Sequence, residues 1–283
     1  MYPAKALRHY LLALQFFTRL PVTGRLAAWV GFSPAMLRAS LGHFPGVGCL
    51  VGVMVATFSA GLLAGLPAGG FSPLVAAAWG TALGVLVTGA FHEDGLADVA
   101  DGLGGAQDRD RALRIMKDSR VGAFGAIWVG MALLAKVSVL AVLASPNGGG
   151  GSSVLVSALV LGHVVSRTWP LFLVRLLPHI GDNVASKSKP VAEQISVASL
   201  CVALLWCFGV LALASCAQVA IDYVAFSSGF AVAIGVALGL SLLAWGVMWR
   251  WFAIRLQGYT GDCLGATQQV CELAFYLGLA LCL

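Results

Sequence analysis

Charged residues are scarce in this sequence. Asp, Glu, Lys and Arg make up 10% of its 283 residues, whereas 59% are hydrophobic. Soluble domains usually contain roughly 25% charged residues, so this chain cannot cover a globule with charge, and a soluble enzyme is excluded. The net charge of +5 does not arise from a dense basic run with interleaved aromatic residues. Nucleic acid is therefore not an expected partner.

The sequence also lacks a cysteine pattern typical of metal binding and a removable signal peptide. Its seven cysteines form no CxxC or Cys/His spacing, and we interpret them as small apolar residues. The apolar stretch from Tyr10 to Phe17 is short and is followed by Thr18-Arg19-Leu20-Pro21 rather than by a small-residue cleavage site. We therefore expect no cleaved leader.

Long apolar runs dominate what is present. A helix of about 20 apolar residues crosses the ~30 Å hydrocarbon layer of a bilayer. Such runs predict an all-α, polytopic integral membrane helical bundle, with one membrane-embedded catalytic domain over residues 1–283. We predict seven spans, near residues 43–64, 72–91, 122–144, 154–174, 196–218, 228–249 and 263–283.

Basic residues occupy alternate connections between these spans. They precede the first span and follow the second, fourth and sixth, with examples at Arg8, Arg111, Lys187, Lys189 and Arg255. The positive-inside rule places such connections in the cytoplasm. We therefore expect the N-terminus in the cytoplasm and the C-terminus outside, with the lipid bilayer as a partner.

Three ionisable residues fall inside predicted spans, where charge is costly unless it is paired or faces a cavity. Arg167 lies one helical turn after His163, near the cytoplasmic end of its span, and is a candidate for binding substrate. Lys136 is interpreted as an internal ion-pair or carbonyl partner. Glu272 is either a buried polar partner or part of a cavity, and the sequence does not decide between these.

Acidic residues are concentrated in the cytoplasmic segment 92–120. Of the 12 acidic residues in the chain, seven lie within 26 consecutive positions. Three have the spacing i, i+4, i+7, which places them within roughly 60° on one face of a helix. They are Asp94, Asp98 and Asp101, and Glu93 precedes them.

Like charges at this spacing repel each other, and a divalent cation would neutralise them. Mg²⁺ prefers carboxylate and water oxygens together with substrate phosphates, so the pattern predicts one or two Mg²⁺ ions bridging a diphosphate, with Asp94, Asp98, Asp101 and Glu93 as candidate ligands. The alternative is a solvated acidic face neutralised by nearby arginines, at positions 109, 111 and 114.

Two further segments contain residues suited to phosphate chemistry. In Met116-Lys117-Asp118-Ser119-Arg120-Val121-Gly122, Lys117 and Arg120 can hold phosphate oxygens, or they only anchor the next span at the headgroups. Before the last span, Thr260, Gly261 and Asp262 stand at a helix start, where free N–H groups suit an anion. Thr260 or Asp262 can equally be a plain N-cap.

These motifs together resemble the cobalamin synthase family, also called adenosylcobinamide-GDP ribazoletransferases. The resemblance rests on residues 91–102, 116–122 and 260–266, with weaker matches at residues 17–22, 44–48 and 166–167 in the same order. It implies an integral membrane, Mg²⁺-dependent enzyme of late cobalamin biosynthesis, in the bacterial inner membrane with its active site on the cytoplasmic face. Its substrates would be adenosylcobinamide-GDP and α-ribazole or α-ribazole 5'-phosphate, and its products adenosylcobalamin or its 5'-phosphate and GMP.

The expected mechanism is attack by the ribose hydroxyl of the ribazole on the phosphorus nearer the cobinamide. Asp118 or Asp262 would bind metal or accept the hydroxyl proton. His92 is a lower-ranked base, because a helical projection places it opposite the acidic face. Arg120 and Arg167 would hold phosphate oxygens.

Two other functional classes are weighed against this one. A CDP-alcohol phosphotransferase also spaces Asp residues by helical steps, but its motif has an Arg and a longer gap where Asp98 and Asp101 follow at once here. A transporter would place ionisable groups near the middle of the membrane. A homo-oligomer is left open.

Overall fold

The computed structural model describes residues 2–146, 149–181, 194–221 and 229–283. Within these ranges the chain is helical and contains no β-strand, only an isolated bridge between His179 and Tyr259. The prediction of an all-α helical bundle is therefore confirmed. Lys187 and Lys189, which support the predicted orientation, lie outside the described residues.

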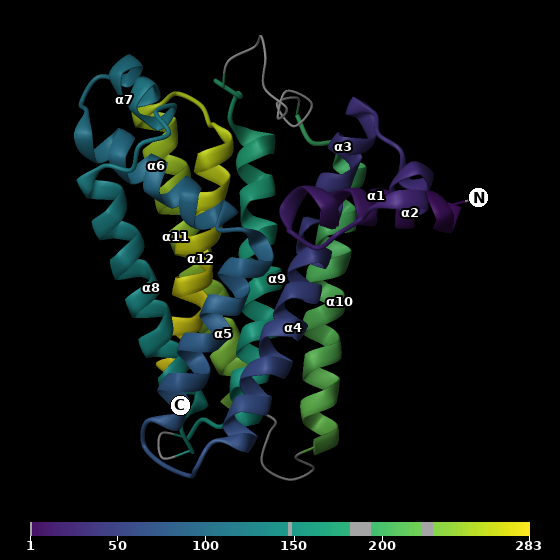
Figure 1. Ribbon diagram of the computed structural model, residues 1–283, viewed down its shortest axis with the longest axis vertical. Coiled ribbons are helices and arrows are strands. Elements are labelled where there is room, and N and C mark those ends of the chain that lie inside the picture. Colours follow the sequence, from purple (N-terminus) through teal and green to yellow (C-terminus); the bar gives the residue numbers. More distant parts are fainter. Residues whose placement is uncertain (1, 147–148, 182–193, 222–228) are drawn as a thin grey trace.

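Seven helices of 17 residues or more form the body of the bundle in Figure 1. They are α4 (Phe44–Gly65), α5 (Ser72–Thr88), α8 (Ala123–Ala144), α9 (Ser152–Leu176), α10 (Val197–Ile221), α11 (Gly229–Arg255) and α12 (Gly261–Ala280). Smaller helices gather at the end of the bundle that carries the N-terminus (Figure 1). They are α1 (Tyr2–Phe17), α2 (Gly24–Val30), α3 (Pro34–Ser40), η1 (Leu41–His43), α6 (Phe91–Gly105) and α7 (Arg109–Met116).

Five helical segments of the described chain are long and apolar enough to cross a membrane. They are Pro34–Gly65, Ala123–Ala144, Ser152–Leu176, Val197–Cys216 and Ala231–Arg255, and the bent pair of α5 and α6 makes a sixth if it counts as one span. Large apolar side chains such as Trp128 on α8 and Phe208 on α10 are exposed on the outside, as expected of a surface that lipid covers. The integral membrane character is supported.

The predicted count of seven spans is not confirmed. The last predicted span corresponds to α12, which is absent from the candidate spans. This helix carries Asp262, Gln268, Gln269 and Glu272 among its 20 residues, and these polar side chains lower its hydropathy. The cytoplasmic position of the N-terminus remains a prediction.

A sharp corner separates α5 from α6. Two consecutive residues, Gly89 and Ala90, have left-handed backbone angles with φ of 67° and 58°, and the two helices meet at 89°. The Arg19 side chain lies against the corner, because a Cβ at Gly89 would come within 2.2 Å of its Nε. The backbone N–H of Arg19 also donates to the Val87 carbonyl at 2.7 Å. The N-terminal segment thus supports the turn that directs α6 away from the α5 axis.

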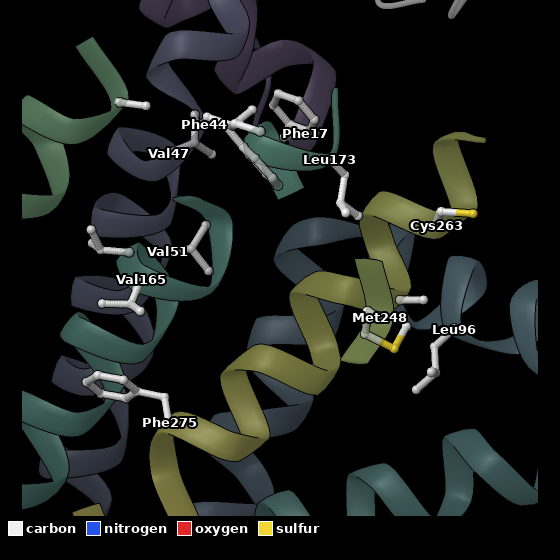
Figure 2. Packing of buried hydrophobic residues seen from close by; sticks show 14 of the residues in the cluster. Phe17, Phe44, Val47, Val51, Leu96, Val165, Leu173, Met248, Cys263 and Phe275 are labelled. Carbon is white, nitrogen blue, oxygen red and sulfur yellow. The ribbon is translucent and has the colours of Figure 1, made fainter. Parts of the chain in front are cut away.

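The core is formed mainly by α4 against α9 and by α12 against α6, α9 and α11. Gly48 of α4 approaches the backbone of α9 so closely that an added Cβ would lie 2.3 Å from the His163 carbonyl oxygen. Figure 2 shows Phe17 beside Phe44, with Val47 and Val51 following along α4. Helix α6 packs mainly against α12 and α8.

Candidate active site

The acidic helix α6 packs directly on the start of α12. An added Cβ at Gly95 would lie 2.7 Å from the Asp262 carbonyl oxygen, and one at Gly265 would lie 3.2 Å from the His92 backbone. A side chain at Gly95 would clash with the α12 backbone, and one at Gly265 would be tighter than an ordinary contact. The two motifs, more than 150 residues apart in sequence, are therefore brought together by close backbone approach.

Asp94 of α6 and Asp262 of α12 border the same pocket, together with Gly261. Burial, followed by repulsion from Asp262, Asp94 and Asp101, raises the pKa of Asp98 to about 7. Burial also raises the pKa of Asp262, with a smaller contribution from Asp94, while the hydrogen bond from Thr260 opposes the shift. The carboxylates therefore repel one another across the interface between α6 and α12.

This donor set has the chemistry that Mg²⁺ requires. Carboxylate oxygens are its preferred protein ligands, and one or two of them usually act together with substrate phosphates. The described residues contain no group of three His, Cys, Asp or Glu side chains arranged to hold a metal ion by themselves. Asp94 and Asp98 thus fit an ion that shares its coordination with a bound diphosphate, with Asp262 close by.

Asp101 has a contact that the sequence reasoning missed. Its two carboxylate oxygens accept hydrogen bonds from the backbone N–H groups of Gly122, at 2.7 Å, and Gly125, at 2.8 Å. These groups belong to the start of α8, whose first N–H groups have no partner within the helix. Asp101 therefore caps α8, and its predicted role as a metal ligand remains a prediction.

Glu93 points toward α12 and is buried. Its Oε1 accepts a hydrogen bond from Gln269 Nε2 at 3.0 Å, while Oε2 has no hydrogen-bond partner among the described residues. Glu93 is thus held by the interface between α6 and α12. Its predicted metal ligation remains a prediction.

The predicted phosphate-binding residues after α7 lie on the surface. Arg120 forms an ion pair with Asp118 through its Nη2 and Oδ2 atoms at 2.5 Å, and this bond lowers the pKa of Asp118 to about 2. Lys117 is the C-cap of α7. None of the three lines the pocket that Asp94 and Asp262 share.

Thr260 stands at the N-cap of α12, but its side chain makes no capping hydrogen bond. Its hydroxyl donates to Asp262 Oδ2 at 3.1 Å instead. The plain-cap interpretation is therefore correct for the position of Thr260 and incorrect for its side chain. Gly261, the first residue of α12, keeps its place beside the pocket.

Arg167 is buried rather than open to the pocket. Its Nη1 lies 2.8 Å from His163 Nδ1, which confirms the proximity predicted from their spacing, and its guanidinium lies 5.7 Å from the centre of the Phe44 ring. Arg167 Nε has no hydrogen-bond partner among the described residues. Its predicted contact with substrate phosphate remains a prediction.

A buried polar network fills the interior below the site. Lys136 Nζ lies 2.6 Å from Glu272 Oε1, and the Tyr276 hydroxyl donates to the same oxygen at 2.8 Å. Gln268 donates to the other oxygen of Glu272 and also bonds Ser166 at 3.0 Å. The predicted ion-pair role of Lys136 is confirmed, and Glu272 is a buried partner.

The pocket beside Asp94 and Asp262 has a volume of about 200 Å³ and a wall of aromatic rings. His92 lines it too, and its ring stacks on Phe44 at 5.8 Å. Burial lowers the pKa of His92 well below its usual value, so the imidazole is neutral. The helical projection places His92 opposite the acidic face, yet both His92 and Asp94 line this pocket. Sequence reasoning missed this aromatic wall, although the adjacent pairs Phe16-Phe17 and Phe91-His92 are its sequence signal.

Comparison with known proteins connects this arrangement to one family. A family model described as cobalamin-5-phosphate synthase matches residues 9–280. The adenosylcobinamide-GDP ribazoletransferase of Albidiferax ferrireducens is 65% identical over 97% of this chain and 98% of that protein. The protein of the same name from Polaromonas naphthalenivorans is 58% identical over 98% and 99%, and that from Vibrio cholerae is 37% identical over 95% and 91%. No solved structure matches the chain significantly.

The fold and the site define an integral membrane protein with a carboxylate-bordered pocket at one end of its helical bundle. The chain belongs to the cobalamin-5-phosphate synthase family, a family of transferases. This assignment agrees with the resemblance of the three motifs. The family match does not support the two alternative classes, a CDP-alcohol phosphotransferase and a transporter.

Proposed function

We propose that the protein transfers the cobinamide phosphate of adenosylcobinamide-GDP to α-ribazole or α-ribazole 5'-phosphate, with release of GMP. Family membership over nearly the whole chain supports this reaction. The observation that carries the proposal is the pocket bordered by Asp94 of α6 and Asp262 of α12. A site with carboxylates from two helices suits a metal-bound diphosphate.

The chemistry requires a new bond between the ribose oxygen and the phosphorus nearer the cobinamide, and loss of the bond to GMP. Mg²⁺, when bound, supplies neutralisation of the diphosphate charge. Asp94 and Asp98 would hold the ion and so orient the diphosphate. Asp262, whose pKa is raised by burial, would accept the proton of the attacking hydroxyl.

Arg120 would bind a phosphate oxygen of the GMP portion. It is 86% exposed and paired only with its near neighbour Asp118 among the described contacts. A surface ion pair contributes little to stability, so a phosphate can replace Asp118 at little cost. The Gly261 N–H at the start of α12 adds a fixed donor close to the acids.

The site would face the cytoplasm of a bacterial inner membrane. The N-terminal helices, α6 and α7 lie at one end of the molecule and the C-terminus lies at the other (Figure 1). Arg8, Arg109 and Arg255 belong to the first of these ends, and basic residues concentrate on the cytoplasmic side of membrane proteins. This distribution supports the orientation.

The proposed reaction is tested with purified protein in detergent or nanodiscs. Adenosylcobinamide-GDP and α-ribazole 5'-phosphate are supplied with and without Mg²⁺, and GMP and the corrinoid product are followed by chromatography and mass. We expect Mg²⁺-dependent release of the two products in equal amounts. Folded protein that forms neither product would overturn the assigned reaction.

A further inference from the structure

The pocket is apolar on one side and acidic on the other. The Phe17 ring stacks on Phe44 with centroids 4.1 Å apart, and Phe16 and Phe91 meet Phe17 edge-on at 4.9 and 6.1 Å. Leu41, Pro170 and Leu171 complete the apolar lining. Asp94, Gly261 and Asp262 form the opposite border. The shape therefore suits a ligand with a flat apolar part joined to a part that carries hydroxyl or phosphate groups.

One residue of this lining has a buried polar atom without a partner. His92 is 1% exposed, and its Nε2 makes no hydrogen bond to any described residue. An unpaired polar atom in such a place is costly. A ligand that supplies one hydrogen-bond acceptor near His92 would recover this loss. The lining thus offers a single hydrogen bond within an apolar surface.

The two substrates of the proposed reaction carry different aromatic bases. Guanine has several donors and acceptors along its edge, and each would need a partner when buried. The base of α-ribazole, 5,6-dimethylbenzimidazole, has an edge of hydrocarbon and one free ring nitrogen. The carboxylates at the opposite border are assigned above to the metal and to proton transfer. The remaining lining, hydrocarbon walls and one unpaired imidazole nitrogen, matches the second base better than it matches guanine.

We propose that this pocket binds the dimethylbenzimidazole base of the ribazole substrate, an inference that rests on the proposed function. The base lies against the Phe17 and Phe44 wall, and His92 Nε2 donates to its free ring nitrogen. The ribose then extends toward Asp94 and Asp262. A volume of about 200 Å³ holds a fused two-ring base and excludes a corrin ring. His92 is accordingly a specificity-determining residue.

The first test narrows the apolar end of the pocket. Leu171→Phe adds volume where the methyl groups of the base lie, and an apolar pocket distinguishes about one methyl group by 10- to 200-fold. We expect the KM of the dimethylated acceptor to rise at least tenfold more than that of the unsubstituted benzimidazole nucleotide. The KM of adenosylcobinamide-GDP should not change.

Leu173→Phe is the matched control. Leu173 is as buried as Leu171 on the same helix, but it does not line the pocket. This variant reports the effect of excess volume in the core without any effect on the base. Equal KM shifts for both acceptors in Leu171→Phe, or a shift confined to the corrinoid substrate, would overturn the assignment. If an acyl chain occupied the pocket instead of the base, Leu171→Phe would leave every KM unchanged, and this result would also overturn the assignment.

The second test addresses His92. Its partner is the ring nitrogen of the base, so an indole nucleotide, which has C–H at that position, should have a KM about tenfold higher in the wild type. In His92→Phe, which keeps a flat ring against Phe44, the benzimidazole and indole acceptors should have equal KM values. A wild-type preference that survives in His92→Phe contradicts the hydrogen bond.

The same variant separates recognition from proton transfer. If His92 were the general base, His92→Phe would lower kcat equally for both acceptors and leave their KM ratio intact. Failure of the proposed function is distinguishable from failure of this inference. In the first case the wild type forms no product from the natural substrates, and in the second it forms product but the KM ratios do not respond to the variants.

Discussion

The start and the middle of α12 differ in how they accommodate negative charge. At its start, Asp262 lies with Asp94 at an open pocket, and repulsion from these two residues contributes to the raised pKa of Asp98. Ten residues later, Glu272 is 1% exposed and bonds Lys136 and Tyr276. The carboxylate at the start of the helix lies close to other acids, whereas Glu272 is paired with a cation.

This difference separates function from stability within one helix. Carboxylates held close together without a countercharge favour an incoming cation, at the expense of folded-state stability. A buried carboxylate paired with an ammonium group needs no ligand, and losing its partner is costly. Changes at the start of α12 should therefore affect turnover, and changes near Glu272 should affect folding.

The largest expected effect is on catalysis at the pocket that Asp94 and Asp262 border. Asp94→Asn removes a charge from an exposed side chain that borders the pocket, and loss of metal-assisted charge neutralisation, worth several kcal/mol, predicts turnover reduced by about 1000-fold or more. The thermal unfolding temperature should stay near that of the wild type. A stable variant with normal turnover would remove Asp94 from the metal site.

At the Lys136–Glu272 pair, the expected effect is on stability. Lys136→Met leaves the Glu272 carboxylate buried without its cation, which predicts a loss of about 3–5 kcal/mol, measured by unfolding in detergent. The double variant Lys136→Met/Glu272→Gln should be more stable than the single one. Turnover per folded molecule should change little. A single variant as stable as the wild type would show that the pair has no such role.

Asp101 lies between the two extremes, because it belongs to the acidic helix and also caps α8. Asp101→Ala removes both acceptors of the Gly122 and Gly125 amides, so we expect a loss of about 1–2 kcal/mol in unfolding free energy. Asp101→Asn, which keeps one acceptor oxygen, is the control. Turnover of Asp101→Asn per folded molecule should fall far less than in Asp94→Asn. An equal loss would support its predicted metal ligation.

The smallest expected effect is on the pH dependence of stability. The pKa of Asp98 is raised to about 7 in the folded protein, so the folded state binds its proton more tightly than the unfolded state. In metal-free protein, stability should decrease as pH rises from about 4 to 7, by about 1 kcal/mol after allowance for solvent screening. Asp98→Asn should flatten the unfolding profile over this range, and Mg²⁺ should reduce the slope of the wild type. A profile unchanged by the substitution would contradict the shift.

Local patterns in the sequence predicted features that lie on one helix. Asp94, Asp98 and Asp101 lie on one helix, as their i, i+4, i+7 spacing indicates. His163 and Arg167 meet as their i, i+4 spacing requires. The five apolar segments follow from run length and composition. Each of these features depends on the helical period and on hydropathy, which neighbouring residues determine.

Contacts between distant segments were not predictable in this way. The partner of Lys136 is 136 positions away, and the sequence left Glu272 undecided between a partner and a cavity residue. Asp101 shares a helical face with Asp94 and Asp98 by period, yet its carboxylate bonds α8. Helix α1 supplies Phe16 and Phe17 to the pocket wall. It is too short to be recognised as a membrane span. Tertiary packing decides all three.

The buried ion pair also constrains how the sequence can evolve. A change at position 136 alone, or at 272 alone, leaves a bare charge in the interior, whereas replacement of both by apolar residues of similar volume is often tolerated. Substitutions at the two positions are therefore expected to occur together. Across the relatives of this chain, we expect Lys136 and Glu272 to be retained together or lost together.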